Sequence, residues 1–166
     1  MIRKALLSGS FDPPTYGHDD LMRRASALYD EVYIVIFIND QKKNFFPIER
    51  RREWLSRLAA KYPNVKVDVD RGFVADYVKR HEIPVILRGV RNETDLRYEI
   101  PMAEYNLTHG GAETLLFYAL EEFVNVSSSR VRKSLMEGTD EAEWLLSPEI
   151  SREICENWRI FHEECQ

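Results

Sequence analysis

Cysteine is scarce in this sequence, and its two cysteines are poorly spaced for a disulfide. Cys155 and Cys165 both fall in a segment whose apolar pattern predicts a helix. Ten helical residues span about 15 Å, whereas the Cα atoms of a disulfide lie about 5.5 Å apart. Their spacing is also not that of a structural zinc site. We therefore expect two reduced thiols and a reducing compartment.

The sequence also lacks a basic excess, a long apolar run and a signal peptide. Its 23 lysines and arginines against 28 aspartates and glutamates give a net charge of −5, whereas nucleic-acid binding depends on basic surface. No apolar run reaches the roughly 18 residues that a membrane span needs. Arg3 and Lys4 are not followed by an apolar signal region. These absences predict a cytoplasmic protein that binds neither nucleic acid nor membrane.

Apolar and amphipathic segments alternate along the 166 residues, which suggest one domain, residues 1–166. The run Val32–Ile38 is continuously apolar, as in a strand buried on both faces of a parallel sheet. The alternation predicts an α/β fold with a doubly wound parallel sheet. Strands are expected at Ala5–Leu7, Val32–Ile38, Val65–Val69, Val85–Leu87 and Thr114–Ala119. Helices are expected near His18–Tyr29, Ile48–Tyr62, Val74–His81, Thr94–Thr108 and Ser128–Glu137.

A final helix is expected after Ser147 and Pro148, which mark a helix start. Its apolar residues form one stripe, made of Ile150, Ile154, Trp158 and Phe161. We expect this stripe to pack on the sheet or on a neighbouring subunit.

The ten residues GSFDPPTYGH (9–18) are the most informative segment of the chain. They connect the first expected strand to the first expected helix and bring His18 to a helix N-terminus. Phosphates bind at such places in α/β sheets, because unpaired N–H groups and the positive end of the helix dipole point there. The dipole should also lower the pKa of His18, and a neutral imidazole still donates one hydrogen bond.

Three further segments at strand ends suit phosphate binding. Lys42 and Lys43 follow the second strand, although a solvated loop explains a lysine pair as well. Arg88-Gly89-Val90-Arg91 follows the fourth strand, and Asp95 and Glu99 are spaced to order its arginines on one helix face. A structural ion-pair network is the competing interpretation. Ser127-Ser128-Ser129 and the arginines after it suit phosphate at a helix N-terminus, or simple N-capping.

The motif GxFDPxxxGH resembles the signature of the nucleotidyltransferase superfamily that carries (H/T)xGH, here Thr15-Tyr16-Gly17-His18. Together with RGVRNETDLRYE (88–99) and SSSRVR (127–132), it resembles the bacterial phosphopantetheine adenylyltransferase family over nearly the whole chain. That resemblance implies a Rossmann-like nucleotidyltransferase fold with C-terminal helices. It implies transfer of the adenylyl group of ATP to 4′-phosphopantetheine, giving dephospho-coenzyme A and pyrophosphate, without a covalent enzyme intermediate.

The resemblance also implies residue roles. His18 would stabilise the transition state, with Lys42 and Arg91 as further catalytic residues. Phosphopantetheine would be bound by Ser10, Lys42, Val74 and Arg88. ATP would be bound by Ser10, Phe11, His18, Gly89, Val90, Arg91, Glu99, Phe123, Val124, Asn125, Val126, Ser127, Ser128 and Ser129. Magnesium would arrive with ATP, because the sequence shows no dedicated metal site. A homohexamer and feedback binding of coenzyme A are further implications.

The sequence departs from the family in four places. Ser10 stands where threonine is usual, and Phe123–Val126 replaces an aromatic pair around a serine, which affects adenine contacts. Arg97 replaces an acidic residue, and the expected loop Thr108–Gly111 lacks a proline. Three other functions stay open. They are a nicotinamide or nicotinate mononucleotide adenylyltransferase, a cytidylyltransferase that uses CTP, and a non-catalytic sensor of nucleotide or coenzyme A.

Overall fold

The computed structural model describes residues 2–39, 41, 43–142 and 146–164. Its centre is one sheet of five parallel strands in the order β3-β2-β1-β4-β5. The strands are β1 (Lys4–Gly9), β2 (Glu31–Phe37), β3 (Val65–Asp70), β4 (Val85–Val90) and β5 (Glu113–Tyr118). All five lie where the sequence predicts strands, with ends that differ by up to three residues.

Helices follow the strands in alternation. They are α1 (Tyr16–Leu28), α2 (Ile48–Ala59), α3 (Val74–Arg80), α4 (Glu93–Gly110), the short 3₁₀ helix η1 (Glu121–Phe123), α5 (Ser128–Glu137) and α7 (Pro148–Glu163). No helix in the described part of the chain is long and apolar enough to cross a membrane.

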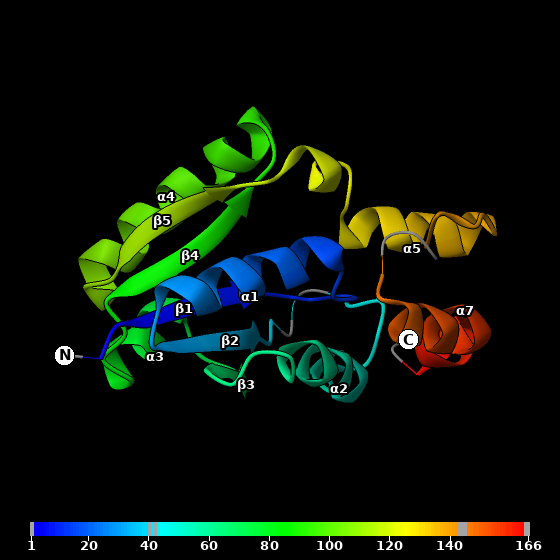
Figure 1. The fold of residues 1–166 in the computed structure, drawn as a ribbon, viewed down its shortest axis with the longest axis horizontal. Helices are drawn as coiled ribbons and strands as arrows, with labels where there is room; N and C mark the ends of the chain where they lie inside the picture. The colour runs from blue at the N-terminus through cyan, green and yellow to red at the C-terminus, as the bar shows by residue number, and fades with distance from the viewer. Residues whose placement is uncertain (1, 40, 42, 143–145, 165–166) are drawn as a thin grey trace.

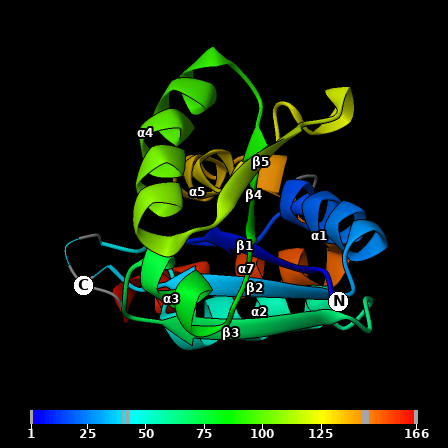
Figure 2. The same cartoon turned by 90° about the vertical axis from the view of Figure 1, so that its left-hand side faces the viewer.

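The central strands β1, β2 and β4 bury side chains on both faces of the sheet, since successive strand residues point to opposite sides. Leu7, Ile34 and Leu87 pack on one side with residues of α1 and α2. Leu6 and Val35 pack on the other side with residues of α3, on which α4 lies. Figure 2 shows α1 and α4 on opposite sides of the strands. The predicted doubly wound α/β sheet is therefore confirmed.

The C-terminal stripe packs within the chain rather than outward. Ile150, Ile154 and Phe161 of α7 are buried, and the ring of Phe161 lies 5.8 Å from that of Trp54 on α2. The sequence left the sheet and a neighbouring subunit open as partners; the stripe packs within its own chain, in the core that α2 shares with the sheet. Both α5 and α7 lie beyond the arrowheads of the strands, at the carboxyl end of the sheet (Figure 1).

Helix ends differ from expectation by up to three residues, and two of these differences concern the site. The helix α1 begins at Tyr16, with Thr15 as N-cap, so His18 is its third residue and not its first. The helix α4 continues to Gly110, so most of the expected loop Thr108–Gly111 is helical. It stops at Gly111, whose φ of 70° is unfavourable for other residues and suits the left-handed cap.

The strand order creates a crevice at the carboxyl ends of β1 and β4. From β1 the chain proceeds outward to β2 and β3, and then crosses to β4 and β5 on the other side. The loops after the neighbouring strands β1 and β4 therefore turn away from each other. In open α/β sheets such a switch point is where ligands bind.

Candidate active site

A cavity of about 700 Å³ opens at this switch point. A second cavity of about 430 Å³ adjoins it along α4. Seven residues line both cavities: Ser8, Gly9, Ser10, Asn44, Arg88, Tyr98 and Glu99. The two spaces therefore meet where β1 and β4 end.

The larger cavity brings together most of the site residues that the sequence predicts. They are Ser10, Phe11, His18, Arg88, Gly89, Arg91, Glu99, Phe123, Val126, Ser127, Ser128 and Ser129. Val74 lines the second cavity instead. Val90, Val124 and Asn125 line neither, and the side chain of Val90 is buried in the sheet. Lys42 and Cys165 lie outside the described residues, whereas Lys43 lines the larger cavity.

The ring of His18 is fixed in one tautomer by the helix N-cap. The backbone N–H of Thr15 donates to Nδ1 of His18 at 2.9 Å, and the Thr15 hydroxyl lies 3.0 Å from the same atom. A nitrogen that accepts a hydrogen bond cannot carry the proton, so a neutral His18 holds its proton on Nε2. The site therefore offers an N–H donor of fixed orientation.

Burial keeps this imidazole neutral. Desolvation, together with the positive charges of Arg91 and then Arg88, lowers the pKa of His18 from 6.5 to about 4. The ring packs beside that of Phe11, at a centroid distance of 4.9 Å. The sequence predicts a lowered pKa of His18 from the helix dipole alone; burial and the two arginines are the causes that the structure supplies.

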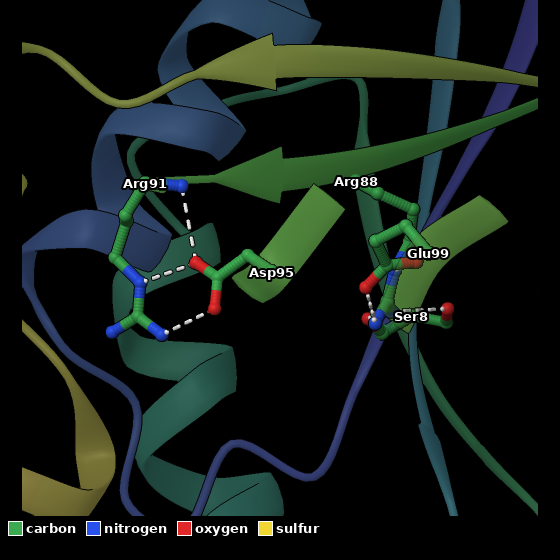
Figure 3. Close-up of polar contacts among 5 residues, drawn as sticks. All are labelled: Ser8, Arg88, Arg91, Asp95 and Glu99. Carbon is green, nitrogen blue, oxygen red and sulfur yellow. Dashed lines mark hydrogen bonds and ion pairs between the residues drawn. The ribbon is translucent and has the colours of Figure 1, made fainter. Parts of the chain in front are cut away.

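The two arginines of the 88–91 segment are each held by a carboxylate from α4 (Figure 3). Arg91 donates from Nε and Nη2 to Asp95 at 2.8 and 3.1 Å, and its backbone N–H also donates to Asp95. Among the described residues no acceptor is found for Nη1 of Arg91, and Arg91 lines the larger cavity, so this nitrogen is available to a ligand. The arginines can therefore form structural ion pairs and still bind a phosphate.

Arg88 is held still more tightly. It donates from Nε and Nη2 to Glu99 at 2.8 and 2.7 Å, and from Nη1 to the backbone oxygen and the hydroxyl of Ser8. These four bonds leave one of the five guanidinium N–H groups for a ligand. Glu99 is only 6% exposed, so its charge is matched mainly by Arg88.

Gly89 lets β4 approach α1 closely. A Cβ at this position would lie 2.8 Å from Cδ1 of Leu21. Its φ is not in the left-handed region. Of the two reasons that the sequence left open for this glycine, close approach is therefore the one that applies.

The three serines before α5 have different partners. Ser127 caps the helix by accepting from the Arg130 N–H at 3.2 Å, and Ser128 donates to the carbonyl of Pro13 at 2.8 Å. Ser129 accepts from Nη2 of Arg132 at 3.1 Å. Capping therefore explains one serine, and the other two join α5 to the GSFDPPTYGH loop and to an arginine.

Several residues that line the cavity have no role assigned from the sequence, among them Thr15, Arg132 and Tyr98, although Thr15 and Tyr98 lie in the two motifs. Thr15 carried a signal, since a threonine three residues before a polar side chain resembles a capping box. For Arg132 the basic cluster was noted, but only the fold distinguishes it from Arg130. The side chain of Arg130 pairs with Glu141 at the surface, whereas Arg132 reaches the backbone oxygen of Asp12 at 2.6 Å.

Four carboxylates line the larger cavity, and all four accept hydrogen bonds from the protein. They are Asp12, Asp20, Asp95 and Glu99. In the described ranges no three His, Cys, Asp or Glu side chains form a group that could hold a metal ion. The residues present therefore do not fit a protein-held metal, and magnesium carried by a nucleotide stays a prediction.

Comparison with known proteins finds a matching family model and similar curated proteins. A family model described as cytidylyltransferase-like matches residues 6–134. The chain is 40% identical over 158 residues to a phosphopantetheine adenylyltransferase of Streptomyces coelicolor, an alignment that covers 95% of this chain and 99% of that protein. It is 40% identical over 153 residues to that of Thermotoga neapolitana, which covers 92% and 94%.

Among solved structures, the chain is similar to Plasmodium falciparum nicotinic acid mononucleotide adenylyltransferase complexed with NaAD. The TM-score is 0.72 at 18% identity, over 97% of this chain and 98% of that chain. At this identity the likeness concerns the fold alone.

Proposed function

The chain belongs to the phosphopantetheine adenylyltransferase family, and we propose that it transfers the adenylyl group of ATP to 4′-phosphopantetheine. The products are dephospho-coenzyme A and pyrophosphate, a step of coenzyme A biosynthesis. The single observation that carries the mechanism is the neutral His18, held as an Nε2–H donor at the switch point by the Thr15 N–H.

The reaction is an in-line displacement at phosphorus. An oxygen of the phosphopantetheine phosphate forms a bond to the α-phosphorus of ATP, while the bond from that phosphorus to the pyrophosphate oxygen breaks. His18 donates a hydrogen bond to the α-phosphate, where negative charge builds up, and remains neutral throughout. Fixed donors of this kind accelerate reactions because they need no reorganisation.

The two adjoining cavities suit two substrates. We assign ATP to the larger cavity, which has the N-terminus of α5 and Arg91 at its walls, and the pantetheine arm to the cavity lined by Val74. Ser10 and Arg88 line both spaces, which supports their role at the phosphate where the substrates meet. Magnesium bound to the triphosphate would neutralise part of its charge.

Assembly, regulation and location complete the proposal. We propose a homo-oligomer, a hexamer by resemblance, because apolar side chains are exposed along α4 and β5 (Leu96, Tyr98, Ile100, Met102, Tyr105, Leu107, Leu115, Leu116 and Tyr118). A surface of this kind marks an interaction site more often than a solvated face. Coenzyme A, a later product of the pathway, would bind the same cavities as an inhibitor. The expected location is the cytoplasm.

The test is pyrophosphate release with ATP and Mg²⁺ in parallel reactions. One receives 4′-phosphopantetheine, a second receives nicotinate mononucleotide, and a third replaces ATP with CTP. We expect release only with ATP and phosphopantetheine. Release only with nicotinate mononucleotide would indicate a mononucleotide adenylyltransferase. Release only in the reaction with CTP would indicate a cytidylyltransferase. Tight binding of coenzyme A without release in any reaction would support a sensor.

A further inference from the structure

A short segment, residues 43–46, forms part of the cavity wall beside the loop that follows β1. Lys43, Asn44 and Phe45 line the cavity, and Phe46 is fully buried beneath them. The ring of Phe45 is stacked on His162 of α7 at a centroid distance of 4.2 Å, and that of Phe46 packs edge-on against Trp54. These ring contacts hold the side chains of Phe45 and Phe46 in place. The backbone of the segment is held by two charged residues, Asp12 and Arg51.

Asp12 holds this backbone from the side of the GSFDPPTYGH loop. One carboxylate oxygen accepts from the Phe45 N–H at 2.7 Å and the other from the Phe46 N–H at 2.9 Å. Asp12 is 5% exposed, so these bonds satisfy a carboxylate that water barely reaches.

Arg51 of α2 holds the same segment from beneath and joins it to β1. Its Nε donates to the carbonyl of Phe46 at 3.0 Å, and its Nη1 donates to the carbonyl of Ser10 at 2.8 Å. The side chain is 3% exposed. One rigid guanidinium thus joins the two neighbouring loops through the carbonyls of Ser10 and Phe46.

We propose that Asp12 and Arg51 are positioning residues, which fix the distance between Ser10 and the 43–46 segment and so align the attacking phosphate. This inference rests on the proposed adenylyl transfer. Removing either side chain also leaves its buried backbone partners without a hydrogen bond, which costs about 1–3 kcal/mol of stability for each unpaired group. A purely structural role would lower stability and leave the kcat of the folded enzyme unchanged, whereas a positioning role lowers kcat.

The decisive variant is Arg51→Met, which keeps the aliphatic volume and removes the donors. We expect kcat to fall about 10- to 100-fold, because small misplacements of reacting groups have effects of this size. The KM for ATP should change less than about threefold, since the opposite end of the cavity at α5 and β4 is untouched. Arg51→Lys, which can reach one carbonyl at a time, should recover part of kcat. The matched control is Arg52→Met, an exposed neighbour on the same helix.

A second readout needs no turnover. In Asp12→Asn the side chain keeps only one acceptor oxygen, so hydrogen exchange at the Phe45 or the Phe46 amide, whichever loses its acceptor, should become at least tenfold faster. Exchange in the core strand β2 should stay unchanged. If wild-type protein releases no pyrophosphate with phosphopantetheine, the proposed function fails while this exchange result still tests the positioning.

Two results would overturn the inference. One is a folded Arg51→Met protein whose kcat equals that of wild type. The other is unchanged exchange at the Phe45 and Phe46 amides in Asp12→Asn. If Arg51→Met does not fold, the kinetic test uses Arg51→Lys instead. An unchanged kcat in that variant would equally contradict the positioning role.

Discussion

At the scale of single residues, the site depends on the pairing of Thr15 with His18. A histidine at a helix N-terminus would have two tautomers if its ring were free to turn. The N–H of Thr15 removes that choice, because it needs an acceptor and finds Nδ1 at 2.9 Å. The helix cap thus sets which ring nitrogen donates to the substrate.

Replacing His18 by alanine should lower kcat about 10²- to 10³-fold, the usual effect of losing one donor to a developing negative charge. The fold should persist, because the lost side chain supports only the helix cap. Steady-state pyrophosphate release measures this change. The exposed His109, on α4, supplies the control His109→Ala. A His18→Ala protein with wild-type kcat would remove His18 from the mechanism.

The stability contributed by His18 should depend on pH in a defined direction. Its pKa is about 4 in the folded protein and 6.5 as the ordinary value, so between these values the unfolded chain binds the proton and the folded protein does not. The contribution is therefore fully present above pH 6.5 and is lost as the pH falls toward 4. Urea unfolding of wild type and His18→Gln across this range should show wild type losing more stability at low pH. A ring that titrates near 6.5 by NMR would contradict the burial argument.

At the scale of elements, α4 and α7 have different structural roles at the site. The helix α4 buries two polar residues, Glu99 and Asn106, and leaves most of its apolar side chains exposed. Its inner face therefore orients arginines rather than filling the core. The helix α7 shows the ordinary pattern, with an apolar stripe inward, and it supports the 43–46 segment through His162.

Asp95→Asn should raise the KM for ATP about tenfold, because Arg91 loses a charged partner and must be ordered by the nucleotide itself. The pKa of Asp95 is lowered, chiefly by the side-chain hydrogen bond from Arg91, so the partner is a carboxylate at neutral pH. Glu93→Gln is the control, since the pair of Glu93 and Arg97 lies on the exposed side of α4. Equal KM values for the two variants would show that Arg91 needs no such partner.

Ile154→Ala in α7 should lower the free energy of unfolding by about 2–5 kcal/mol, because it opens a cavity in the core. Ile160→Ala, on the same helix and 58% exposed, should change it by less than about 0.5 kcal/mol. Urea unfolding followed by tryptophan fluorescence compares the two. Similar losses for both variants would mean that the outer face of α7 is also covered.

At the scale of the whole molecule, the chain buries its C-terminal stripe and exposes another apolar surface. The strand β5 is an edge of the sheet, and with α4 it presents the exposed apolar side chains named above. An uncovered edge with apolar neighbours favours association.

Sedimentation should therefore give a mass well above that of one chain. Ile100→Glu, at the centre of α4, should shift the protein toward the monomer, because a charge cannot be buried there without a partner. Leu28→Glu, on the exposed side of α1, should leave the mass unchanged. An unaltered mass in Ile100→Glu would exclude this surface as the contact.

The sequence by itself determined the sheet, the order of its elements and the segments that meet at its carboxyl edge. Strand and helix periodicity are local properties, and parallel strands bring their following loops to one edge whatever the details. The GSFDPPTYGH and RGVRNETDLRYE segments could therefore be placed at one site, with His18, Arg88 and Arg91 among its residues.

Only the tertiary structure decided which hydrogen-bond partner each polar group has. Asp12 lies in the GSFDPPTYGH motif and Arg51 in no motif, but the sequence reveals the partners of neither, because these are backbone atoms of loops up to 41 positions away. The same holds for the tautomer of His18, the choice of Arg132 over Arg130, and the inward packing of α7. Each of these depends on distances between segments that are remote in the chain, which periodicity and spacing do not encode.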